Sequence, residues 1–161
     1  MLDPATIFTP GEAFDVPLTD EVLRSVEAEL GRRLPAAYVD IARQHNGGWL
    51  ARNTHPAPRR TTWAEDHVGV DSLAAIGRSQ AFSLCGPGGS AFWVEEWGYP
   101  DIGVYVASCP SAGHDMIALD YRGPGEPVVV HVDQEWDYRI TVLAPDFETF
   151  LRGLVDGPDQ G

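Results

Sequence analysis

Hydrophobic positions along this chain follow a helical period near both ends and a strand-like period in between. Leu23, Val26 and Leu30 would share one face of a helix over about residues 20–30. Thr19 immediately precedes this stretch and is a suitable N-cap, because its hydroxyl can accept a hydrogen bond from a free amide of the first turn. The pattern therefore predicts an amphipathic helix that begins directly after Thr19.

A second helical pattern lies in residues 34–49, LPAAYVDIARQHNGGW. Pro35 suits the first helical position, where its missing N–H has no cost, and Tyr38 and Ile41 follow at helical spacing. The Asn-Gly-Gly that comes next supplies left-handed conformations that end a helix. Trp49 then has two interpretations, a core residue that covers the helix end or a residue that contacts a partner.

The segments before and after these helices have weaker patterns. Three prolines make residues 1–18 an extended arm against the domain or a loose tail, and residues 51–67 are typical of an exposed loop. Residues 68–77, VGVDSLAAIG, indicate a short strand or turn followed by helix. Ser90 can cap a further short helix. We expect three parts: an arm (1–18), one domain (19–155) and a C-terminal tail (156–161).

The second half changes to the strand period. Turn residues separate four short apolar segments, so neighbouring strands are expected to form antiparallel hairpins. The predicted strands are residues 102–108, 115–121, 127–133 and, more weakly, 138–144.

A final helix is predicted from the most regular apolar spacing in the chain, which is i, i+3, i+4, i+7. It comprises Phe147, Phe150, Leu151 and Leu154. The predicted fold class is α+β: a largely antiparallel sheet with N-terminal helices and a C-terminal helix packed on it, all on one face.

Charge restricts the classes of partner. The 161 residues suit a single domain, and they carry 11 basic and 24 acidic side chains, a net charge of −13. Residues 95–161 hold 13 acidic and 3 basic side chains, so most of the negative field comes from this half. Such a surface repels nucleic acid and anionic membranes and favours a basic protein, although negative charge can also serve solubility alone.

Two separated cysteines form neither a disulfide framework nor a zinc motif. The N-terminal residues have no basic region followed by an apolar core, and no apolar run approaches the length of a membrane span. We therefore expect a cytoplasmic protein with free thiols. We also expect a monomer rather than an oligomer.

Candidate chemistry is sparse. A metal site would have to gather histidines and aspartates of the strand region, namely His114, Asp115, Asp120, His131 and Asp133. His131 and Asp133 would share a strand face, but Asp115 and Asp120 would point in opposite directions. No nucleophile motif or phosphate-binding loop is present. We expect no catalytic residues, no metal and no cofactor.

An acidic and aromatic set of residues is the remaining candidate. Carboxylates around aromatic anchors are typical of an interface for a basic protein; alternatively, the tryptophans belong to the core and the carboxylates to a solvated rim. The candidate partner-binding residues are Trp49, Glu95, Glu96, Asp101, Asp115, Asp133, Glu135 and Trp136.

Five segments in this order resemble the SMI1/KNR4 family of the SUKH superfamily. The helix LPAAYVDIARQHNGGW, EEWGYPDIGVYVAS, the hairpin GHDMIALDYRG, the strand EPVVVHVDQE and the helix LAPDFETFLRGL are similar to its motifs, over about residues 19–155. The chain departs from the family pattern at His114, where a glycine is common, and in a long Arg/Pro loop at 51–62.

The resemblance implies an α+β fold without catalysis. In bacteria such proteins resemble immunity proteins that neutralise a cognate polymorphic toxin, often a nuclease, whereas eukaryotic relatives look like regulatory scaffolds. The expected function is thus an immunity-type protein that binds a basic toxin through its acidic surface. The alternatives are a regulatory or scaffold module without a toxin and, third, a hydrolase.

Overall fold

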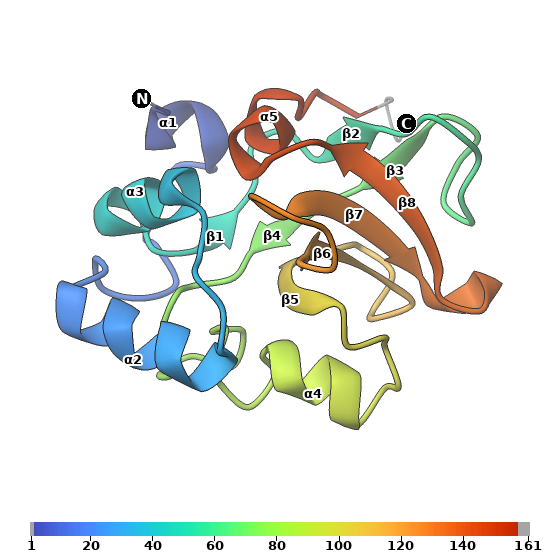
Figure 1. The fold of residues 1–161 in the computed structure, drawn as a ribbon. Coiled ribbons are helices and arrows are strands. Elements are labelled where there is room, and N and C mark those ends of the chain that lie inside the picture. Colours follow the sequence, from blue (N-terminus) through green and yellow to red (C-terminus); the bar gives the residue numbers. More distant parts are fainter. Residues whose placement is uncertain (1, 158–161) are drawn as a thin grey trace.

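A six-stranded antiparallel sheet forms the centre of the molecule in the computed structural model, which describes residues 2–157 (Figure 1). Its strand order is β1-β4-β5-β6-β7-β8, so β1 and β8 are the two edges. The strands are β1 (Gly48–Trp49), β4 (Ser72–Leu73), β5 (Gly103–Ser108), β6 (Asp115–Asp120), β7 (Val128–Asp133) and β8 (Arg139–Ala144). A separate two-stranded sheet pairs β2 (Thr54–Pro56) with β3 (His67–Gly69).

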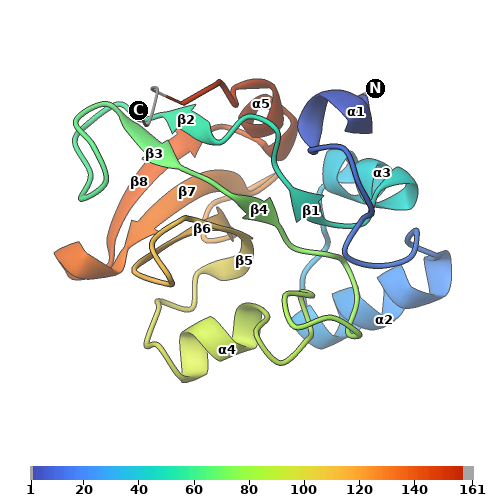
Figure 2. The ribbon, with the colours of Figure 1, turned by 180° about the vertical axis from the view of Figure 1, so that it is seen from behind.

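Helices cover both faces of the main sheet. They are α1 (Pro4–Ile7), α2 (Asp20–Leu30), α3 (Ala36–Gln44), α4 (Ser90–Glu95), the 3₁₀ turn η1 (Gln134–Trp136) and α5 (Phe147–Arg152). In Figure 1, α3 and α5 lie above the sheet and α4 lies below it, and the reverse view in Figure 2 agrees. The α+β class and the C-terminal helix are confirmed, but the expectation that all helices share one face is wrong.

The two-sided cover follows from the strands themselves. All six residues of β6 are buried, and five of the six in β7. Ile117 and Val129 face the larger core with α3 and α5, whereas Met116 and Val130 face a smaller core beneath α4. Because side chains of a strand alternate between faces, a strand that is apolar on both needs a cover on both. The helix α4 supplies the second one.

The two N-terminal helices begin and end close to the predicted residues. The Thr19 hydroxyl accepts a hydrogen bond from Val22 N at 3.3 Å, and Gly31 ends α2 in the left-handed conformation. Pro35 is the N-cap of α3 rather than its first helical residue. Gly47 has a φ of 77°, and a Cβ there would lie 2.7 Å from Ala75 N, so this turn requires glycine.

The central segment differs from its predicted structure. Residues 68–77 contain the end of β3, all of β4 and no helix, because Leu73 pairs with both β1 and β5 and so completes the sheet. The expected loop at 51–67 contains β2 and the first residue of β3, which pair in the small sheet. Arg59 donates hydrogen bonds to Ile140 O and Thr141 Oγ1 at the β8 edge.

The N-terminal arm lies against the domain. It begins with α1 (Pro4–Ile7), and both Phe8 and Leu18 are buried in the larger core. Thr9 N donates to Trp49 O at 2.9 Å, so the arm runs along the outer side of β1. The arm therefore covers one edge of the main sheet. The last four residues, 158–161, belong to the predicted tail and lie outside the described part.

The C-terminal helix α5 provides a test of the core. Phe150 is fully buried and stacks with His55 at 4.9 Å and with Phe147 at 6.0 Å. We expect Phe150→Ala to lower the free energy of unfolding by about 3–5 kcal/mol, because it removes a large buried ring and leaves a cavity. Urea denaturation measures this. Val142→Ala, at a side chain that is 52% exposed, is the control and should change it by less than about 0.5 kcal/mol. Equal effects of the two substitutions would contradict this description of the core.

Candidate functional site: an acidic aromatic face

The short helix α4 presents two different sides. Trp93 and Val94 are half-buried against the smaller core, whereas Glu95 and Glu96 are exposed. The chain then turns at Gly98, which has a φ of 75°. The helix therefore covers the sheet with its apolar side and holds two adjacent carboxylates in solvent.

An aromatic cluster packs around the apolar side of this helix. Trp93 lies 5.3 Å from Trp97 and 6.0 Å from Tyr99, measured between ring centroids. The buried Tyr99 donates its hydroxyl to Gly113 O at 2.6 Å, and its ring contacts Tyr138 at 5.2 Å. Tyr138 in turn donates to the carbonyl of Trp97. These contacts fix α4 to the turn before β6 and to the start of β8.

His114 connects α4 with η1. Its ring meets Trp97 edge-on at 5.9 Å, and its Nδ1 lies 3.0 Å from an oxygen of Glu135. Two parts of the sequence that are about forty residues apart are thus joined on one surface. Trp136 follows Glu135 and is exposed, with the Arg139 guanidinium 5.3 Å from its ring centroid.

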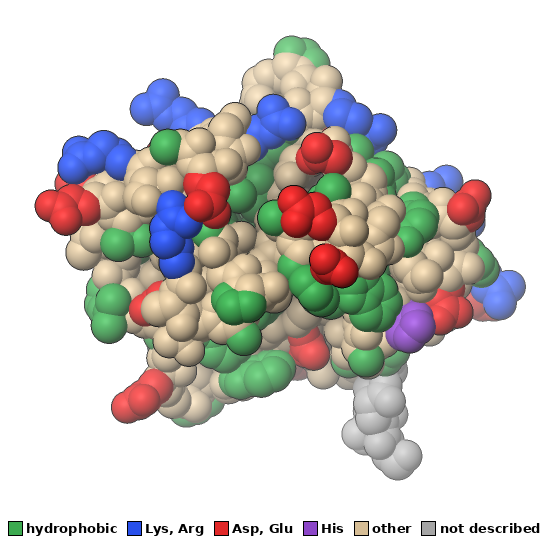
Figure 3. All heavy atoms as spheres, turned by 90° about the horizontal axis from the view of Figure 1, so that it is seen from below, with side chains coloured by type: hydrophobic (Ala, Val, Ile, Leu, Met, Phe, Trp, Pro, Cys, Tyr) green, Lys and Arg blue, Asp and Glu red, His purple; other side chains and the backbone are tan. Residues whose placement is uncertain are grey.

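We call this surface the acidic aromatic face. We define it by Trp97, His114 and Glu135, which contact one another, and by exposed residues near them in sequence, namely Glu95, Glu96, Asp101, Trp136 and Asp137. Figure 3 views the side of the molecule that carries α4 and shows carboxylate groups beside apolar side chains, with a histidine close by. The face thus combines a negative field with aromatic surface that is not fully buried.

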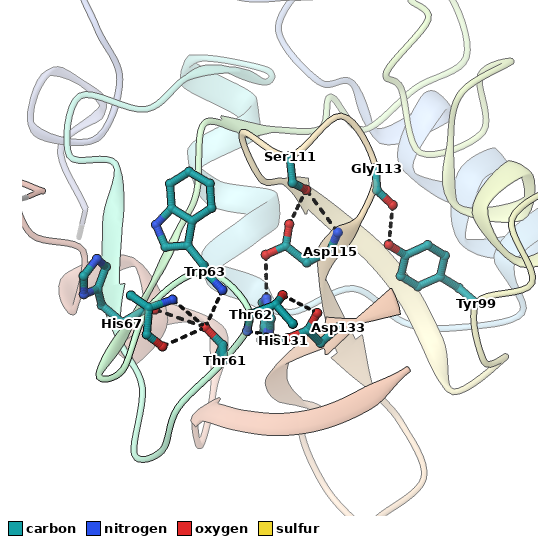
Figure 4. A network of polar contacts seen from close by, with 11 residues as sticks. Thr61, Thr62, Trp63, His67, Tyr99, Ser111, Gly113, Asp115, His131 and Asp133 are labelled. Atoms are coloured by element: carbon teal, nitrogen blue, oxygen red, sulfur yellow. Dashed lines mark hydrogen bonds and ion pairs between the residues drawn. The ribbon is translucent and has the colours of Figure 1, made fainter. Parts of the chain in front are cut away.

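Two of the predicted partner-binding residues are buried and are therefore not on this face. Asp115 and Asp133 are 2% and 1% exposed, so neither can contact a partner directly, and their assignment to a surface rim is wrong. Both lie on the strand side that faces the larger core, together with His131 (Figure 4). Sequence spacing could not reveal this, because the loop that covers them comes from residues 51–66.

These aspartates instead anchor loops. Asp133 accepts hydrogen bonds from Thr62 N at 2.9 Å and from the Thr62 hydroxyl at 2.6 Å. Asp115 accepts from the Ser111 hydroxyl and from His131 Nε2, the latter at 2.7 Å (Figure 4). The network therefore fastens the 51–66 loop and the β5–β6 turn to one end of the sheet.

Trp49 lies apart from the acidic aromatic face. Its side chain is 57% exposed, which excludes the core interpretation, and its ring meets Phe14 edge-on at 5.6 Å. It belongs to the edge strand β1, whereas η1 precedes the opposite edge strand β8. A single small interface around η1 would therefore not include Trp49.

Trp97 and Asp137 belong to the acidic and aromatic set of the second half but were not among the candidate partner-binding residues, and His114 was considered only as a metal ligand. The spacing of Trp93 and Trp97, i and i+4, is a local signal for one helical surface. The contact of His114 with Trp97 depends on tertiary structure and has no such signal.

One group of potential metal ligands occurs in the described part of the chain. The ligand atoms of Cys109, Asp115 and His131 lie within 4.8 Å of one another, and all three residues are buried. His131 and Asp115 are 2.7 Å apart, a hydrogen-bond distance, whereas two ligands of one tetrahedral zinc ion lie about 3.3 Å apart or more. Their geometry is that of a hydrogen-bonded pair in the core.

The chelator test follows from this geometry. Because His131 Nε2 and Asp115 already share a hydrogen bond, we expect no metal to contribute to folding, and EDTA should leave the melting temperature unchanged in a thermal scan. A large fall in EDTA, reversed by one particular metal ion, would contradict this and assign the three residues as ligands. Cys109→Ser, assayed in the same way, would then separate a ligand role from simple packing.

The two thiols are poorly suited to nucleophilic chemistry. Burial, aided by the nearby Asp115 carboxylate, raises the pKa of Cys109 well above its usual value. Burial and a hydrogen bond with Glu29 raise the pKa of Cys85 to about 12. Because the thiolate is the reactive form, neither residue is an activated cysteine at neutral pH.

We therefore expect slow alkylation of both thiols. At about pH 8 an ordinary exposed cysteine is partly thiolate and reacts readily with iodoacetamide. The native protein should remain largely unmodified by mass spectrometry over a period in which the guanidinium-unfolded protein is fully modified. Rapid alkylation of Cys109 in the native state would show that this region opens and that its thiol is activated.

Fold and surface together define an α+β domain with a largely antiparallel sheet and an acidic aromatic face. A model of the SMI1 / KNR4 family (SUKH-1) matches residues 17–153, and the chain belongs to this family. No curated protein and no solved structure matches the chain. None of the helices within residues 2–157 has the length and apolar character needed to cross a membrane.

Proposed function

We propose that this protein is a non-enzymatic, immunity-type protein that neutralises a cognate protein toxin by binding it through the acidic aromatic face. The observation that carries the proposal is that His114 contacts both Trp97, which follows Glu95 and Glu96, and Glu135, which precedes the exposed Trp136. Membership of the SUKH-1 family supports a role in protein binding.

The chemistry of this face suits a basic partner. Five exposed carboxylates create a negative potential that accelerates the encounter with a positively charged surface. Trp136 can supply buried contact area once the complex forms, as aromatic anchors do at the centre of interfaces. A nuclease toxin has a cationic substrate groove because it binds phosphate, so an acidic face of this kind could occupy that groove and exclude the nucleic acid.

Several further points support a binding role in the cytoplasm. The two cysteines are free, which suits a reducing compartment, and their raised pKa values are unfavourable for catalysis. We propose a monomer that binds no cofactor. A regulatory or scaffold module without a toxin would use the same face, and the two functions differ in whether a toxin gene adjoins the gene for this chain.

The proposal is tested with the protein encoded by the adjacent gene. We expect its association rate to fall as salt rises, because the Debye length is only about 8 Å near physiological ionic strength. The double reversal Glu95→Arg/Glu96→Arg should reduce the association rate at low salt by roughly tenfold or more. Stopped-flow or surface-based kinetics measure both effects, and co-expression with the toxin should show loss of protection.

The matched control makes the same change of charge at other surface positions. Glu12 and Glu65 are exposed and form no ion pair within residues 2–157, so Glu12→Arg/Glu65→Arg changes the net charge equally away from α4. Both double variants should keep the wild-type melting temperature. Equal slowing by both would mean that overall charge, not this face, guides the encounter. Association that ignores salt and the α4 reversal would refute the proposed surface.

A further inference from the structure

A pocket of about 380 Å³ lies between the N-terminal arm, α2 and the segment that follows β4. Leu18 and Ile76 form its buried apolar part, and Val16 and Val22 line it with side chains that are 72% and 39% exposed. Its volume falls in the range of ligand sites, and its lining is chiefly apolar. Contact of these two valine side chains with water is unfavourable, and an apolar group bound in the pocket would remove that contact.

Hydrogen bonds hold the pocket in this shape. The side-chain amide of the buried Asn46 donates to Val16 O at 3.0 Å and to Ile76 O at 3.1 Å, and its oxygen accepts from Ile76 N at 2.8 Å. The Ser79 hydroxyl donates to Asp15 at 2.8 Å. Three chain segments are thereby tied together around the hollow. A site that is already formed loses less entropy when it binds a ligand.

Carboxylates give this pocket a negative rim. Asp15 and Glu21 line it, and neither forms an ion pair within the described residues. Arg78 also lines it, but its guanidinium is paired with Glu29 and hydrogen-bonded to the Ser25 hydroxyl. The positive charge of Arg78 is therefore offset by Glu29, whereas the negative charges of Asp15 and Glu21 have no such partner within the described residues.

We infer that this pocket is a docking site for an aliphatic side chain of a protein partner, with arginine or lysine residues directly beside that side chain. The apolar hollow selects the central residue, and the carboxylates of Asp15 and Glu21 select its basic neighbours. The inference deepens the proposed function, on which it rests for the partner being a basic protein. It adds a second contact, which shares no residue with the acidic aromatic face.

The probe is the peptide N-acetyl-Arg-Leu-Arg-amide, titrated into the isotopically labelled full chain and followed by amide chemical shifts. We expect saturable shifts at Val22, Gly77 and Asn46. Replacing the central leucine by alanine should weaken the binding about tenfold, because most of the buried apolar area is lost. N-acetyl-Glu-Leu-Glu-amide, which has the opposite charge, should not bind measurably.

Two variants locate the effect. Val22→Arg places a cation at the pocket on an exposed helix position and should abolish the shifts. Val142→Arg introduces the same change on the β8 edge, where the valine is similarly exposed, and should leave the titration unchanged. Glu21→Gln, which retains shape and removes one charge, should weaken the binding several-fold. Unchanged one-dimensional spectra of the variants would show that each is folded.

Three outcomes overturn the inference. Equal binding of the leucine and alanine peptides would mean that charge alone attracts the peptide. Equal binding of an uncharged N-acetyl-leucine-amide would make the pocket a general site for small apolar ligands. Shifts confined to α4 and η1, insensitive to Val22→Arg, would place the contact on the acidic aromatic face. No toxin is involved, so failure here leaves the proposed function to its own kinetic test.

Discussion

Burial of the three central strands on both faces is the constraint on which this structure depends. The strand β6 has no exposed residue, so each polar side chain on it must find a partner inside the protein. At one end Asp115 binds His131 and Ser111, and at the other Asp120 receives two side-chain donors and one backbone donor from Arg122. The hydrogen bond from the Arg122 guanidinium holds the pKa of Asp120 below its usual range. The sheet is thus continuous because its buried carboxylates are satisfied.

The same constraint determines where a partner can bind. A sheet that is apolar on its second face needs α4 as a cover, and a helix of only six residues has one side for the core and one for solvent. The solvent side carries Glu95 and Glu96, and the aromatic cluster beneath it ties α4 to His114 and η1. The strand carboxylates Asp115, Asp120 and Asp133 instead accept hydrogen bonds from residues of the adjoining loops. The negative charge that remains accessible in this half therefore lies on the helices and in the connections between the strands, and connections are where binding residues commonly occur.

Much of the fold was predictable because its signals are local. Thr19, the Asn-Gly-Gly turn and the spacing of Phe147, Phe150 and Leu151 act through hydrogen bonds and periodicity within a few residues, and the helices occur where they predict. The four main strands were found for the same reason. The strand β1 was missed, and a strand was only one of two alternatives for the segment that contains β4. Two residues carry no detectable period, and the partner strands, β4 for β1 and β5 for β4, are far away in sequence. The position of α4 on the second face of the sheet was missed. The alternation of side chains along a strand shows that a face is apolar but not which element covers it.

The sequence by itself determined the fold class, the family and the excess of negative charge, since these depend on composition, local spacing and the order of motifs. Only the tertiary structure decided which acidic residues are accessible. Asp133 and Glu135 are two positions apart and chemically similar, yet one is bound to Thr62 in the interior and the other pairs with His114 at the surface. The difference arises from a loop seventy residues earlier in the chain. Contacts between such distant segments leave no trace in the local pattern, so the accessible part of the candidate site could be read only from the folded protein.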